Sequence, residues 1–163
     1  MDISSVDKLS TQHYHCVMMP PFDANGNLPP GMHTATWQGF VSRFATTAHR
    51  RRLLAGLQAA LHALRVAGCS MVYIDGSFVT AKQIPNDYDA CWDIEGVDPI
   101  LLDPILLDFD NGRAAQKAKY LGELFPAQMG EGGSGTTFLE FFQIDKESGT
   151  SKGIIAIDLR RFP

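Results

Sequence analysis

The sequence predicts an α/β domain in which helices flank a short mixed β-sheet. Residues 71–74 and 154–159 are short runs of apolar, β-forming side chains, a pattern typical of buried strands. Apolar residues spaced by three and four positions between residues 34 and 67 indicate amphipathic helices. With 163 residues, of which 45% are hydrophobic and 20% charged, the chain has the composition of one globular domain.

The domain itself is expected to span residues 34–163, after an irregular N-terminal segment of residues 1–33. Pro20-Pro21 and Pro29-Pro30-Gly31, together with an Asn-Gly-Asn turn, interrupt this segment too often for the interior of a helix or strand. We expect the segment to lie over the domain surface or on a partner.

Two consecutive helices are expected before the first central strand. In the first, aromatic side chains of residues 37–44 fall on one face. In the second, leucines repeat at intervals of four and three residues up to Gly68, which can end the helix. The basic residues 50–52 at its start oppose the helix dipole, which indicates either a solvated turn or a contact with an anionic group.

The segment MVYIDGSFVTAKQIPNDYDACW, residues 71–92, contains the candidate functional residues. A sharp turn at Gly76-Ser77 follows the first strand, and a second strand is expected from Asp87 to the end of the segment. Alternate side chains of a strand project to the same face, so Asp87 and Asp89 lie together. Two neighbouring carboxylates repel each other, and a divalent cation bound by both would remove this cost.

The second half of the chain contains a further acidic residue in an apolar strand, Asp158. Before it we expect a short helical turn, an extended segment at 106–109 and a helix over 111–125. Residues 137–144 fit either a strand or a short helix. As a strand they would form a hairpin with residues 154–159 and turn Asp158 toward the Asp pair.

These residues resemble the nucleotidyltransferase superfamily, and most of all its small stand-alone members, the minimal nucleotidyltransferases. The resemblance rests on a strand ending in Gly76-Ser77, a short connection, Asp87-x-Asp89 on the next strand, and a later apolar-Asp-apolar strand with Asp158. It covers residues 53–159 and implies the polymerase-beta-like nucleotidyltransferase fold.

The resemblance also implies an activity and its catalytic residues. Such enzymes transfer a nucleoside monophosphate from a nucleoside triphosphate (NTP), here expected to be ATP, to a hydroxyl acceptor and release pyrophosphate. Asp87, Asp89 and Asp158 would be the catalytic carboxylates and the ligands of Mg²⁺ or Mn²⁺.

Phosphate contacts are expected from the turn and from the loop that follows it. Gly76 lets a phosphate approach the backbone, and Ser77 offers a hydroxyl and a backbone N–H as donors. Lys82, in the connecting loop, would balance the triphosphate charge. We interpret Asp75, which precedes the glycine, as structural.

Charge and composition restrict the partners. The net charge of −4 argues against a large nucleic acid, although a local basic patch could still bind one. No apolar run approaches the roughly 20 residues of a membrane span. The three cysteines lack metal-ligand spacing, which fits a reducing cytoplasm. By resemblance, small proteins of this type occur in prokaryotic toxin–antitoxin or phage-defence pairs, so a partner toxin is the expected acceptor.

Two other functions fit the same residues. The fold could serve as a binding module or antitoxin that holds a partner with weak or no catalysis. A hydrolase could use the same carboxylates with a metal ion, but the Gly-Ser turn favours triphosphate binding over simple hydrolysis. Taken separately, the turn and the Asp-Tyr-Asp sequence are also common in ordinary surface turns.

Overall fold

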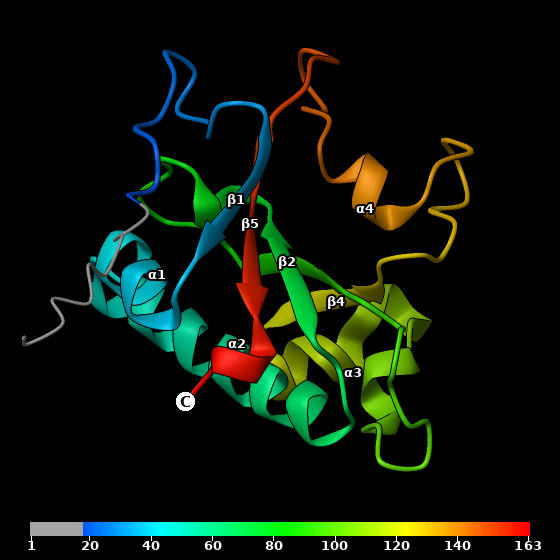
Figure 1. The fold of residues 1–163 in the computed structure, drawn as a ribbon. Helices are drawn as coiled ribbons and strands as arrows, with labels where there is room; N and C mark the ends of the chain where they lie inside the picture. Colours follow the sequence, from blue (N-terminus) through cyan, green and yellow to red (C-terminus); the bar gives the residue numbers. More distant parts are fainter. Residues whose placement is uncertain (1–17) are drawn as a thin grey trace, which may run out of the picture.

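Five short strands form the centre of the protein in a computed structural model that describes residues 18–163 (Figure 1). In chain order they are β1 (Gly31–Ala35), β2 (Met71–Asp75), β3 (Tyr88–Trp92), β4 (Gly122–Pro126) and β5 (Gly153–Asp158). Their order across the sheet is β1-β5-β2-β3-β4. β2 runs antiparallel to β5 and β3, whereas the edge strands β1 and β4 run parallel to their inner neighbours. The predicted mixed sheet with flanking helices is therefore confirmed.

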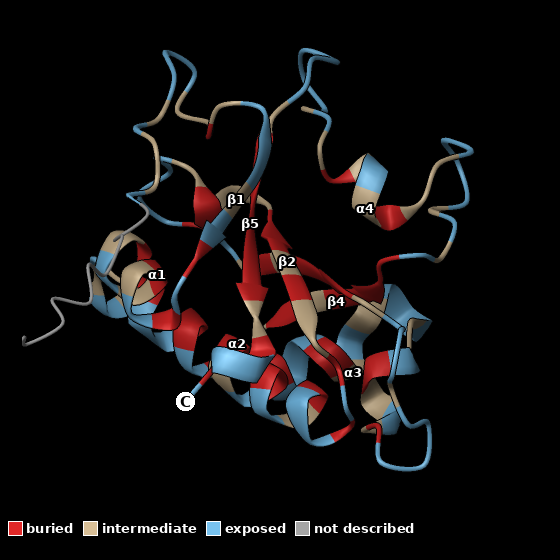
Figure 2. Cartoon of the chain, in the orientation of Figure 1, coloured by how far each residue is buried: buried red, intermediate tan, exposed pale blue. Residues whose placement is uncertain are grey.

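Helices α1 (Trp37–Phe44) and α2 (Ala48–Val66) supply the main apolar core together with one face of the sheet. The hydroxyl oxygens of Thr36 and Thr47 cap them by accepting hydrogen bonds from backbone N–H groups of the first turn. In Figure 2 the central strands and the inward sides of α2 are buried, while its outward side is exposed. No helix among residues 18–163 is long and apolar enough to cross a membrane.

The opposite face of the sheet carries a smaller apolar cluster that includes α4 (Phe138–Phe141). β3, β4, β5 and the α4 segment contribute its buried residues, which are Cys91, Phe125, Ala127, Phe138, Phe142 and Ile154. The rings of Phe125 and Phe138 stack with their centroids 4.1 Å apart. This is the face on which the candidate site lies.

The prediction of a helix over residues 111–125 is right only in its middle part. At its start, Asn111, Gly112 and Arg113 take left-handed conformations with φ 50°, 64° and 61°. α3 (Asp110–Tyr120) ends where Leu121 takes a left-handed conformation with φ 61°, and β4 follows. Gly122 lies against the ring of Tyr88, its register partner on β3, so the two strands approach closely there. Pairing with β3, a tertiary contact, thus decides the conformation of this segment.

The expected irregular N-terminal segment also contains a strand. Its residues 1–17 lie outside the described residues, and residues 31–33 belong to β1. Most β1 side chains are not buried, so no apolar pattern marks the strand. It forms because its backbone pairs with β5 at the sheet edge.

In the second half, one of two alternatives is confirmed for residues 137–144, the short helix, and the prediction for residues 106–109 is wrong in part. Residues 137–144 contain the helix α4 and do not form a hairpin with β5, whose neighbours are β1 and β2. Thr137 and Glu140 start this helix with a capping box. The expected extended segment at 106–109 begins instead inside a 3-10 turn, Pro104–Leu107.

Candidate functional site

The turn after β2 brings the chain into contact with a carboxylate of β3. Gly76 adopts φ 80° and ψ −172°, a conformation that residues with side chains rarely adopt. A Cβ atom at this position would also overlap Oδ2 of Asp89. Glycine is therefore required here by both backbone and space, and Ser77 begins a 3-10 turn directly after it.

Three carboxylates form a row across β2, β3 and β4. Asp75 is paired with Asp89 in the β2–β3 register, and Asp89 is paired with Glu123 in the β3–β4 register. Paired residues of neighbouring strands point to the same face, here the face of the smaller apolar cluster. Asp87, which directly precedes β3, adds its charge to this group, since it lies close enough to act on Asp89, but it lines a separate hollow with Arg52 and Lys117. The group thus contains the predicted Asp87 and Asp89 and, in addition, Asp75 and Glu123.

Burial and mutual repulsion make these carboxylates hard to ionise together. The pKa of Asp89 is raised to about 7, first by desolvation and then by the like charges of Asp87, Glu123 and Asp75. Desolvation and the charge of Glu123 likewise raise the pKa of Asp87. The nearby cations Lys117, Lys82 and Arg113 only partly offset these effects on the pKa of Asp87, and a cation bound directly by the Asp pair would offset them further.

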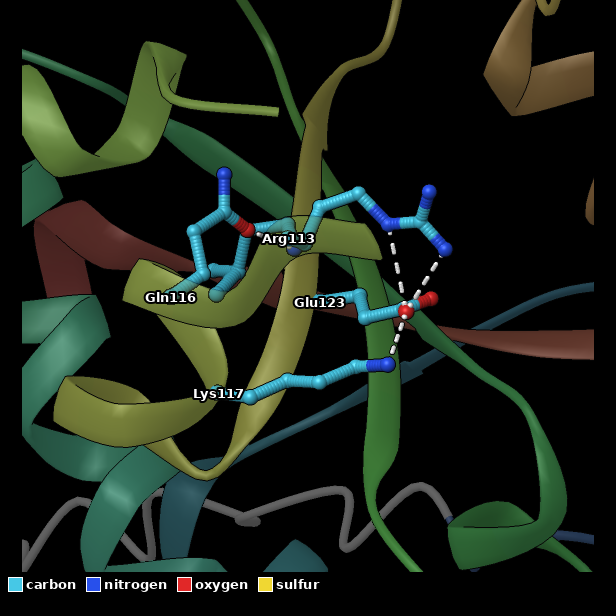
Figure 3. A network of polar contacts seen from close by, with 5 residues as sticks. Arg113, Gln116, Lys117 and Glu123 are labelled. Atoms are coloured by element: carbon cyan, nitrogen blue, oxygen red, sulfur yellow. Dashed lines mark hydrogen bonds and ion pairs between the residues drawn. The ribbon is translucent and has the colours of Figure 1, made fainter. Parts of the chain in front are cut away.

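Glu123 differs from its neighbours because two cations from α3 hold it (Figure 3). Its Oε1 lies 2.8 Å from Nη2 of Arg113 and 2.9 Å from Nζ of Lys117. Burial alone would raise the pKa of Glu123, but hydrogen bonds from Lys117 and Arg113 outweigh burial and lower it. Gln116 accepts a hydrogen bond of 2.7 Å from the backbone N–H of Leu124, which fixes α3 against β4. α3 therefore keeps Glu123 ionised next to the Asp pair.

The row opens into a cleft of about 660 Å³. The carboxylates of β2 and β3 and the Gly76-Ser77 turn line one part of it, and the turn at residues 145–152 lines another. Asn27 joins the second turn to the N-terminal region, because its side-chain amide donates a hydrogen bond of 2.7 Å to Oδ2 of Asp145. Both of these segments lie beyond the same end of the sheet (Figure 1, blue and orange-red). The cleft has the size of a small-molecule site.

A lysine from the 145–152 turn reaches the floor of this cleft. Nζ of Lys152 lies 3.0 Å from Oδ1 of Asp75 as an ion pair, and the two side chains are 15% and 7% exposed. Desolvation raises the pKa of Asp75 despite the nearby ammonium. Because its carboxyl lines the cleft, the interpretation of Asp75 as purely structural is incomplete.

Arg50 stabilises the loop that follows the Gly-Ser turn. The residue is 4% exposed. Its guanidinium donates hydrogen bonds to the carbonyl oxygens of Phe44, Phe78, Thr80 and Lys82. Arg50 is therefore neither solvated nor free to bind an external anion, whereas Arg51 and Arg52 are exposed, as a solvated turn predicts. The side chain of Lys82 is exposed and does not line the cleft, so the structure does not bring it together with Gly76 and Ser77.

Asp158 lies at the other end of the sheet, so the prediction that it faces the Asp pair is wrong. Asp75 is opposite Asp89, whereas Met71, at the start of β2, is opposite Asp158. Four residues of strand, about 13 Å, separate the two positions. Asp158 instead accepts hydrogen bonds of 2.9 Å from the backbone N–H, Nε and Nη2 of Arg160. The side-chain hydrogen bond from Arg160 is the main cause of its lowered pKa.

Glu123 is the residue of this site that sequence reasoning missed. It lies in the segment for which a continuous helix is expected, and a helix there does not predict the pairing of Glu123 with Asp89 of β3. One signal is present in the sequence. Gly122 can end a helix, and the following run of an acidic residue and apolar residues has the length of a strand.

The carboxylates fit a hard divalent cation by their chemistry. Mg²⁺ and Mn²⁺ prefer oxygen ligands, and burial together with neighbouring carboxylates raises the pKa of both Asp87 and Asp89, so a bound cation would favour their ionised forms. In the arrangement described for residues 18–163, however, no three His, Cys, Asp or Glu side chains converge as a metal site. Glu123 is occupied by Arg113 and Lys117 in this arrangement.

Comparison with known proteins assigns the chain to a family. A search of curated proteins and a search of solved structures found no match. Residues 20–158 match a family of unknown function, DUF6932. This range contains all five strands and the four clustered carboxylates. Because the match covers well over half of the 163 residues, the chain belongs to the DUF6932 family.

Proposed function

We propose that this protein is a metal-dependent nucleotidyltransferase with a polymerase-beta-like fold. It would transfer a nucleoside monophosphate from an NTP, with ATP as the first candidate, to a hydroxyl acceptor and release pyrophosphate. One observation carries the proposal. Asp75, Asp89 and Glu123 form a row across three strands at the Gly76-Ser77 turn, Asp75 and Asp89 open into the cleft, and the charge of Asp87 acts on Asp89. The resemblance of the turn and the Asp-x-Asp strand to nucleotidyltransferases supports it.

Glu123 takes the place of Asp158 as the third catalytic carboxylate in this proposal. Glu123 is in register with Asp89, whereas Asp158 is bonded to Arg160 at the far end of β5. Asp87, Asp89 and Glu123 would therefore hold Mg²⁺ or Mn²⁺. When bound, such a cation polarises the phosphate under attack and neutralises charge on the leaving pyrophosphate.

The side chains and backbone of the site would orient the reactants and move one proton. The acceptor O–H would give its proton to the ionised carboxylate of Glu123 as its oxygen bonds to the α-phosphorus. The bond from that phosphorus to the pyrophosphate oxygen breaks. Backbone N–H groups of the turn and the hydroxyl of Ser77 would donate hydrogen bonds to phosphate oxygens. Gly76 keeps this approach free of a side chain.

The acceptor in this proposal is a hydroxyl group of a cognate protein partner in a prokaryotic toxin–antitoxin or phage-defence system, in the cytoplasm. The resemblance to small stand-alone nucleotidyltransferases supports this assignment. The net charge of −4 supports it as well, because repulsion disfavours a long nucleic acid as the acceptor.

Transfer of label from the α-phosphate of each NTP tests the activity. The protein is incubated with Mg²⁺ and the product of the neighbouring gene, and labelled protein and free pyrophosphate are measured. Asp87→Asn is expected to abolish both signals. Asp110→Asn, which alters an exposed carboxylate of α3, should leave them unchanged. Absence of both signals with every NTP, with Mg²⁺ or Mn²⁺, would contradict the proposal.

A binding module is the second candidate, and one observation favours it. Arg113 and Lys117 pair with Glu123, so cations of this chain already occupy one of the three carboxylates proposed to hold the metal. Tight co-purification with a neighbouring gene product, without pyrophosphate release, would support this function over catalysis.

A further inference from the structure

Lys152 is a cation of the cleft that the proposed reaction leaves without a role. Its side chain is 15% exposed and its ammonium lies 3.0 Å from Oδ1 of Asp75, which is itself almost fully buried. An ion pair removed from water recovers little net stability, because desolvation offsets the attraction. Structural stabilisation alone therefore does not account for a lysine at the cleft floor.

The turn that carries Lys152 is fixed by its own hydrogen bonds. The carboxylate of Asp145 accepts hydrogen bonds from the backbone N–H groups of Glu147 and Ser148 and from the amide of Asn27. These bonds hold the turn to the N-terminal region and occupy both carboxylate oxygens of Asp145. The turn can therefore present a cation at a defined position in the cleft.

The charges that line the cleft make Lys152 important for an anionic ligand. Four acidic side chains and two lysines line it: Asp75, Asp89, Asp145, Glu147, Lys146 and Lys152. Lys146 is exposed, and its Nζ lies 5.5 Å from the ring centroid of Phe141. Lys152, by contrast, is largely buried and pairs with Asp75, the residue directly before the Gly76-Ser77 turn.

We propose that Lys152 binds the β- and γ-phosphates of the NTP and makes the cleft selective for triphosphates over monophosphates. Asp75 is then a positioning residue, which holds the ammonium at the floor until phosphate oxygens become its partners. Charge-assisted hydrogen bonds to phosphate are stronger than neutral ones. The β- and γ-phosphates of an NTP can form them with Lys152, whereas a nucleoside monophosphate lacks these two groups and binds more weakly. The inference rests on the proposed function, since it takes an NTP as the ligand.

Calorimetric titration with a non-hydrolysable ATP analogue and with AMP, both in Mg²⁺, tests this inference. The wild type should bind the triphosphate analogue more tightly than AMP. Lys152→Gln should weaken binding of the analogue by about 10- to 100-fold, as expected for loss of a charge-assisted bond, with little change for AMP. Lys152→Arg should retain most of the selectivity. Lys119→Gln, which removes an exposed lysine paired with Asp103, should leave both affinities unchanged.

Lys152→Gln leaves the buried carboxylate of Asp75 without its cation, and this variant could fail to fold. A double variant keeps the inference testable in that case. Asp75→Asn combined with Lys152→Gln removes both charges and should lose triphosphate selectivity as the single variant does. A folded variant of either kind that keeps wild-type selectivity would overturn the inference and leave the nucleotidyltransferase proposal intact. A wild type that binds neither nucleotide would overturn both.

Discussion

Asp89→Asn should make the metal-free protein more stable above neutral pH, although it removes a proposed catalytic group. Desolvation, followed by the charges of Asp87, Glu123 and Asp75, raises the pKa of Asp89 from 3.8 to about 7 in the folded protein. A tenfold change in proton affinity between folded and unfolded states corresponds to about 1.4 kcal/mol. Ionised Asp89 therefore costs the wild type on the order of 2–4 kcal/mol of folding free energy.

This cost has a definite dependence on pH. The unfolded chain releases the proton of Asp89 near pH 3.8, whereas the folded protein holds it up to about pH 7. Between these values the folded state binds more protons, so this group lowers wild-type stability as the pH rises. Above about pH 7 the carboxyl is ionised in both states, and its contribution becomes constant. Asparagine resembles the neutral carboxyl in shape and removes the dependence.

Urea unfolding in the presence of a chelator measures the difference. The variant and the wild type should have similar free energies of unfolding at about pH 4. At about pH 8 the variant should be more stable by on the order of 2–4 kcal/mol. The m-values of the two proteins should be equal. Asp110→Asn, at an exposed carboxylate, should not show this widening gap. A gap at pH 8 no larger than at pH 4 would refute the reasoning. If the carboxylates hold a metal ion as proposed, added Mg²⁺ should stabilise the wild type more than the variant, which lacks one of the ligands.

Three further substitutions test the rest of the site. Glu123→Gln should abolish pyrophosphate release whereas Asp158→Asn should retain it, and the opposite result would contradict the assignment of the third carboxylate. Gly76→Ala places a Cβ against a carboxylate, so calorimetry should show a lower melting temperature and weaker NTP binding; unchanged binding would separate the turn from phosphate recognition. Arg50→Met leaves the carbonyl oxygen of Phe44 in α1 and three carbonyl oxygens of the loop without their donor, and should lower the free energy of unfolding by about 3 kcal/mol in urea titrations. The exposed Arg51→Met is its control, and equal losses in the two variants would contradict a specific role for Arg50.

The amino-acid sequence by itself determined the features that depend on neighbouring residues. The spacing of leucines predicts α2, and a short apolar run predicts β2. Both predictions succeed because residues that are buried by an element recur, or follow one another, within a short stretch of sequence. The tight turn at Gly76 follows in the same way, since its positive φ suits glycine. The proximity of Asp87 and Asp89, close enough for the charge of one to act on the other, follows from the two-residue repeat of a strand.

Only the tertiary structure decided which carboxylates meet. Alternation tells which face a side chain occupies, but strand direction and register decide at which end of the sheet it lies. β5 runs antiparallel to β2, which carries Asp158 away from Asp89. Pairing with β3 turns residues 122–126 into a strand and places Glu123 beside Asp89 instead. These contacts join residues far apart in the chain, and for that physical reason no local pattern in the sequence contains them.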